Sequence, residues 1–156
     1  MNQDISQQVQ LLLNIDAVSP NDSITIMSVC SQVLNSAAYI TTLTNALNPV
    51  FNIPTFDLVS EIAQVLLALI KMAAVCTYSQ NIPSEQLKYV LWASLYYYLV
   101  TNQQNLLRTV DLGSIRLAYS NGFELIVIPV EQVQIVAKTV CDSCLSCFGW
   151  SKKTHI

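Results

Sequence analysis

Two long apolar segments, separated by a short polar break, occupy the middle of the chain from Thr55 to Val100. The break is Ser79-Gln80-Asn81-Ile82-Pro83, whose polar residues and proline interrupt helical structure. The first segment gathers its apolar residues on one broad helical face and leaves only a narrow polar stripe. We therefore expect a helix that is covered over most of its circumference. Thr55 is expected to cap this helix, with Asp57 in the first turn at the positive end of the helix dipole.

The second segment, residues 84–100, is apolar or aromatic on every side and carries no charge after Lys88. A helix of this kind is either the central helix of a core or a membrane span. The apolar run from Leu87 to Val100 is shorter than the about 20 residues that a span needs. Glu61 and Lys71 also interrupt the preceding segment. We therefore expect a central core helix, whose tyrosines pack with their hydroxyl groups bonded to a partner or to water.

Two further helices are expected before this region. The first runs from Asp4 to Val18, and the second runs from Asp22 or Ser23 to about Leu47, with apolar residues on one face and uncharged polar residues on the other. Between Asp22 and Asp57 the chain has no charged residue and no histidine. Such a face can be buried against a partner at modest cost, since no ion loses its water. The alternative is that these side chains simply face solvent. The interface candidates in this helix are Ser28, Ser31, Gln32 and Asn35.

The strongest local signal after Val100 is Asn121-Gly122, which lies between two runs of β-forming residues. This dipeptide favours a two-residue type I′ turn, because both turn positions need positive φ. We therefore expect a β-hairpin over residues 114–128 that is apolar on both faces. Leu125 and Val127 on this hairpin are further interface candidates, because hairpin edges and apolar faces can pair with another subunit.

The predicted fold is one mainly α domain over residues 1–150, since 156 residues suit a single domain. It comprises a bundle of about four or five helices, the hairpin 114–128, and a last helix from Val130 to about Phe148. Residues 151–156 are expected to form a flexible tail.

The composition limits the classes of partner and compartment. Charged residues make up 11% of the chain, where about 25% is typical of a globular domain. The formal net charge of −3 provides no basic surface, which argues against nucleic acid as a partner. The N-terminus lacks the basic and long apolar regions of a secretory signal. Together with five cysteines, this favours a reduced intracellular location, either the cytoplasm or a virion.

The chain lacks the residues that several classes of enzyme need for catalysis. His155 is the only histidine and stands one residue from the C-terminus, so a histidine base would have to lie on a tail. The three glycines, Gly113, Gly122 and Gly149, are isolated and form no phosphate-binding loop. We expect no catalytic residues and no cofactor.

Three cysteines at three-residue spacing, Cys141, Cys144 and Cys147, precede Trp150. They could pack as small apolar side chains in the last helix. They could instead bind a metal, but a fourth cysteine is missing from the run. Acylation of these cysteines, with Trp150 and the adjacent lysines at the interface, would tether the helix to a membrane. A disulfide is the fourth reading.

The sequence therefore favours a non-enzymatic structural or assembly protein that associates with protein partners, above all with itself, such as a scaffold or virion component. The alternative is a small membrane-associated adaptor held by the cysteine-rich C-terminal helix. A third hypothesis is a thiol protein that binds metal or acts in redox chemistry.

Overall fold

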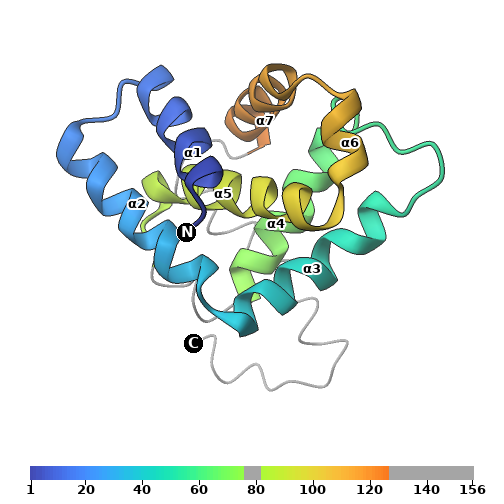
Figure 1. The fold of residues 1–156 in the computed structure, drawn as a ribbon, viewed down its shortest axis with the longest axis horizontal. Helices are drawn as coiled ribbons and strands as arrows, with labels where there is room; N and C mark the ends of the chain where they lie inside the picture. The colour runs from blue at the N-terminus through green and yellow to red at the C-terminus, as the bar shows by residue number, and fades with distance from the viewer. Residues whose placement is uncertain (76–81, 127–156) are drawn as a thin grey trace.

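The computed structural model describes residues 1–75 and 82–126. Within these ranges the chain forms seven helices joined by turns and loops (Figure 1). They are α1 (Gln3–Ile15), α2 (Pro20–Leu34), α3 (Ala37–Phe51), α4 (Ile62–Val75), α5 (Ser84–Asn102), α6 (Gln104–Thr109) and α7 (Leu112–Ile126). The mainly helical character expected from the sequence is therefore confirmed for this part of the chain.

The central element is α5, which crosses the middle of the molecule in Figure 1. Every side chain from Tyr89 to Leu99 is buried except that of Tyr97, which is partly exposed. The helix packs mainly on α1 and α2, whereas α4 packs mainly on α3 and α7. The two central apolar segments are thus consecutive along the chain but have different neighbours, and together they supply about half of the buried residues of one hydrophobic core.

The single helix expected from residue 22 or 23 to residue 47 is in fact two helices, α2 and α3, bent by 84°. The break has a local cause. The Ser36 side chain accepts a hydrogen bond from the Tyr39 amide at 3.2 Å and so starts a new helix. The preceding residue, Asn35, ends α2. The sequence does not reveal this break, because the apolar residues keep their helical spacing across Asn35 and Ser36.

The prediction that Thr55 caps the next helix is wrong. Thr55 has a φ of 61°, which is a left-handed conformation rather than the extended one of a capping residue. Asp57 takes the capping role, since its carboxylate accepts a hydrogen bond from the Val59 amide at 3.1 Å. The Glu61 carboxylate in turn accepts one from the Asp57 amide at 2.9 Å. These two bonds form a reciprocal box ahead of α4, which begins at Ile62.

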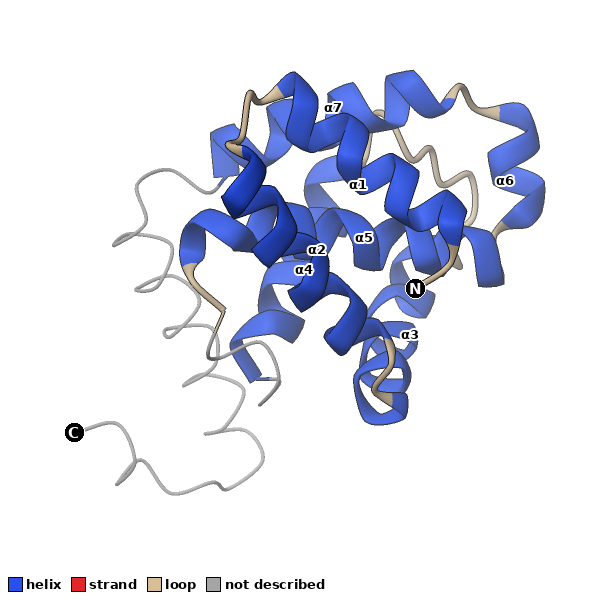
Figure 2. Ribbon diagram, turned by 60° about the vertical axis from the view of Figure 1, so that its left-hand side comes forward, coloured by secondary structure: helices blue, strands red, loops and turns tan. Residues whose placement is uncertain are grey.

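The predicted β-hairpin over residues 114–128 is also wrong. The described part of this range belongs to α7, and Figure 2 shows no strand among the described residues. Asp111 starts the helix by accepting a hydrogen bond from the Ser114 amide at 3.0 Å. Ile115, Tyr119 and Phe123 then bury one side chain per turn.

Gly122 belongs to a helix–helix contact rather than to a turn. A Cβ atom at this position would lie 2.8 Å from Leu66 Cδ1 and 3.4 Å from Ile62 Cγ2 on α4. The missing side chain lets α7 approach α4 closely. The sequence alone does not distinguish a glycine that allows close helix packing from one that allows a positive φ.

The predicted last helix, the tail 151–156 and Val127 lie outside the described residues. So do Cys141, Cys144, Cys147 and Trp150. Within the described ranges, no one helix combines the length and the apolar character needed to cross a membrane, and α2 with α3 reaches them only jointly, across the bend.

Candidate interaction surface

Beyond Asp22 in its first turn, the exposed residues of α2 and all those of α3 are uncharged, and the two helices follow one another along the lower part of the molecule in Figure 1. No charged residue occurs between Asp22 and Asp57. The exposed side chains follow the helical period on each helix. We call this set the α2–α3 outer face; it consists of Ile24, Thr25, Ser28, Gln32, Asn35, Thr41 and Asn45.

Four interface candidates from the sequence thus lie on one helix. Ser28, Gln32 and Asn35 are exposed, and Ser31 is partly buried beside them. Leu125 is 74% exposed, but it belongs to a different helix, α7. The structure therefore places the four polar candidates together at α2 and Leu125 on α7.

The α2–α3 outer face is less polar than its sequence suggests. The Thr25 hydroxyl donates to the Asn21 carbonyl at 3.2 Å, and the Thr41 hydroxyl donates to the Ala37 carbonyl at 3.0 Å. Because each hydroxyl hydrogen already has a partner in its own helix, burial against another protein would remove only the water bonded to the hydroxyl oxygen. Ile24 adds a large apolar side chain that is 69% exposed.

The ionic groups of the fold include a buried network that sequence reasoning missed. Lys88 on α5 is only 7% exposed, and its ammonium donates to Asp16 Oδ2 at 2.8 Å and to Glu124 Oε1 at 3.0 Å. The Tyr89 hydroxyl donates to the same Asp16 oxygen at 2.9 Å, and the Tyr119 hydroxyl donates to the Lys88 carbonyl. This network joins the end of α1 and the second half of α7 to α5. No local sequence pattern predicts this network, because Asp16 and Glu124 are distant in sequence from Lys88.

Polar groups on the aromatic side chains of the core also have partners. The Trp92 indole donates to the Gln8 carbonyl at 3.1 Å, and the Tyr98 hydroxyl donates to Asn48 Oδ1 at 2.7 Å. The Tyr39 and Ser94 hydroxyl groups lie 2.6 Å apart. For these residues, the expectation that the aromatic groups pack with satisfied polar groups is confirmed.

Burial suppresses the ionisation of these core groups. It raises the pKa of Tyr119 well above its usual range and also raises the pKa of Tyr98. For Tyr89, burial is the largest cause of the raised pKa, and the hydrogen bond to Asp16 adds to it. Burial likewise raises the pKa of the Cys30 thiol to about 12. Cys30 is therefore a protonated core side chain with little nucleophilic character at neutral pH.

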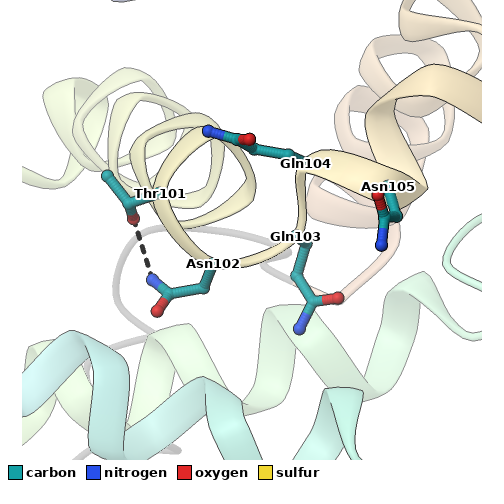
Figure 3. Close-up of a pocket in the computed structure, with 5 residues that line it drawn as sticks. All are labelled: Thr101, Asn102, Gln103, Gln104 and Asn105. Atoms are coloured by element: carbon teal, nitrogen blue, oxygen red, sulfur yellow. Dashed lines mark hydrogen bonds between the residues drawn. The ribbon is translucent and has the colours of Figure 1, made fainter.

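A polar hollow of about 260 Å³ lies at the corner between α5 and α6 (Figure 3). It is lined by five consecutive residues, Thr101 to Asn105, and the Asn102 amide donates to the Thr101 hydroxyl at 2.8 Å. None of the five is charged or apolar, so the hollow lacks the apolar walls that hold most small ligands.

No three metal-ligating side chains come together within residues 1–75 and 82–126. Comparisons of the chain with models of protein families, with curated proteins and with solved structures gave no match. Function must therefore be inferred from the surfaces and from the buried groups themselves.

Proposed function

We propose that the chain is a non-enzymatic structural subunit that associates with copies of itself through the α2–α3 outer face. The observation that carries this proposal is the uncharged exposed side of two consecutive helices. Net charge of one sign keeps most proteins apart. In a chain of net charge −3, a second copy meets the least repulsion where no charge is present.

The desolvation cost of this face supports the proposal. An ion loses several kcal/mol of hydration when it is buried without a partner, whereas a neutral amide or hydroxyl loses far less. Thr25 and Thr41 lose least, because their hydroxyl groups are bonded within their own helices. Ile24 provides apolar area that a partner would remove from water.

The test is light scattering on a size-exclusion column, over a dilution series and with reductant. The full chain should elute as a defined oligomer. Gln32→Glu should weaken self-association about tenfold, because each copy would bury a carboxylate at the contact. Gln7→Glu is the matched control: Gln7 is also an exposed helical glutamine, but it lies on α1.

The two variants carry the same net charge, so a difference between them reports position alone. A wild-type chain that is monomeric at every concentration would refute self-association. Equal weakening by both variants would show that net charge, rather than the α2–α3 outer face, controls association.

A further inference from the structure

The Asn121-Gly122 pair, which is suited to a turn, lies inside α7 and ends four residues before Ile126, the last residue of the helix. The Asn121 side chain is exposed, so its amide is accessible to water. Asparagine deamidates most readily when glycine follows it, because glycine has no side chain to obstruct the attack of its backbone nitrogen on the amide. The pair therefore combines high chemical reactivity with a position inside a helix.

Deamidation of this pair is a displacement within the chain. The backbone nitrogen of Gly122 forms a bond to Cγ of Asn121, and the bond from Cγ to Nδ2 breaks. Nδ2 leaves as ammonia with the proton of the attacking nitrogen, and a five-membered succinimide ring remains. Water then opens the ring at either carbonyl carbon, which gives aspartate or isoaspartate. Water is the one reactant consumed, and nothing is oxidised or reduced.

The helical conformation of α7 opposes this attack. In an α-helix each N–H donates to the carbonyl four residues earlier, so the nitrogen of Gly122 is already engaged. Ring closure also needs a different ψ at Asn121 from the helical value of about −42°. The close packing of Gly122 on Leu66 of α4 resists such a rotation. The folded helix therefore protects a pair that the unfolded chain would expose.

We infer that Asn121 is a latent deamidation site, which is protected while α7 is folded and reacts when α7 opens. The opening is local to this helix. α7 buries three side chains, those of Ile115, Tyr119 and Phe123, along a single face. Gly122 also weakens the helix from within, since glycine is a poor helix former. Elements with few buried contacts open at a lower free energy than the core of a protein.

The products of the reaction do not fit back into the same helix. Isoaspartate adds a carbon atom to the main chain, which disrupts the spacing of the helical hydrogen bonds. Both products also carry a new carboxylate three residues before Glu124, and like charges that are neighbours on a helix destabilise it. Each chain whose α7 has opened and reacted is therefore modified irreversibly. The reaction takes place at α7 and does not depend on the proposed self-association.

The test is peptide mass spectrometry of the full chain, incubated at mildly alkaline pH both folded and in concentrated urea. Exchange of an NH2 group for OH raises the mass of the peptide that contains Asn121. In urea, this peptide should react faster than any other asparagine peptide. In the folded chain it should react at least about a hundredfold more slowly, because the rate follows the population of the open form.

Phe123→Leu and Phe51→Leu form a matched pair, because both remove a buried aromatic ring, one from α7 and the other from α3. Phe123→Leu should speed deamidation of the folded chain about tenfold, since loss of packing favours opening of α7. Phe51→Leu should change the rate less than about twofold. Each rate is divided by that of the same variant in urea, which removes effects on the intrinsic reaction, and circular dichroism verifies that both variants are folded.

Three results would overturn the inference. If the folded wild type reacts at Asn121 as fast as the chain in urea, α7 provides no protection. If Phe123→Leu and Phe51→Leu accelerate the reaction equally, the pair is exposed by unfolding of the whole chain rather than of α7. If neither accelerates it, opening of α7 is not the step that exposes the pair. The purified deamidated chain should also unfold at a lower urea concentration than the unmodified chain, and an equal midpoint would show that the products do fit the helix.

Discussion

The buried ion pair between Lys88 and Asp16 predicts that removing one member costs more stability than removing the other. In Asp16→Asn, the asparagine keeps the shape of the side chain and a carbonyl oxygen that can accept from Tyr89. The Lys88 ammonium, however, remains buried without its closest carboxylate, 2.8 Å away. Breaking a buried pair in this way costs about 3–5 kcal/mol. Since Glu124 remains as a partner and Asp16 is itself 21% exposed, we expect about 2–3 kcal/mol here.

Lys88→Met should cost much less, about 1 kcal/mol or below. Methionine keeps an unbranched apolar stem in the same space, and the Asp16 carboxylate left behind still accepts from Tyr89 and reaches solvent. The double variant should be about as stable as Lys88→Met alone, which gives a coupling energy of about 2 kcal/mol.

The assay is urea unfolding of the four proteins at neutral pH, followed by circular dichroism, with equal slopes as the check on comparability. A Lys88→Met variant that loses as much stability as Asp16→Asn would refute this reasoning. It would show that the ion pair contributes net stability, rather than that the buried ammonium merely requires a carboxylate.

Three further predictions test the local structure. Ala17 has a φ of 54° just after α1, where glycine is preferred, so Ala17→Gly should raise the free energy of unfolding by about 1 kcal/mol, while Ala63→Gly within α4 should lower it. Replacing a helical glycine by alanine normally raises the free energy of unfolding by about 1 kcal/mol, but Gly122→Ala should give no such gain, because the added Cβ would meet Leu66. Gly122→Val should lower the free energy of unfolding by about 2 kcal/mol in the same urea assay. Finally, burial raises the pKa of Cys30 from its usual 9.0 to about 12. Below pH 9.0 the thiol is protonated in both the folded and the unfolded chain. As the pH rises from 9.0 towards 12 the thiol ionises in the unfolded chain alone, which stabilises the unfolded state. The free energy of unfolding should therefore decline above pH 9.0, and less steeply in Cys30→Ala; an equal decline would exclude Cys30 as a cause.

The sequence predicted those parts of the fold that depend on side-chain periodicity. A segment that is apolar on every side can only be covered on every side, so α5 was correctly placed at the centre of the core. The errors arose where a local signal has two physical origins. Asn121-Gly122 is suited to a tight turn, but Gly122 is equally suited to the close packing of α7 on α4. Only the tertiary contact with Leu66 distinguishes the two roles of this glycine.

Other features were out of reach because they depend on distant partners. The role of Lys88 requires Asp16 and Glu124, which approach it only after α1 and α7 have packed on α5. The uncharged interface candidates were recognisable, since absence of charge is a property of the sequence itself. The exposed apolar side of α7 was not, because Leu117 and Leu125 share it only when the segment is helical.

Ionic strength should test the α2–α3 outer face without any substitution. The α2–α3 outer face contains no ion, so a contact there should persist or strengthen in concentrated salt. If charges joined the copies instead, added salt would weaken the contact, because screening shortens the Debye length from about 8 Å at physiological salt to about 3 Å at 1 M. Light scattering in rising sodium chloride should therefore show a wild-type particle whose mass stays the same or grows. If the wild type instead dissociates to a monomer, the contact through α2 and α3 is ionic, and its uncharged surface cannot be what joins the copies.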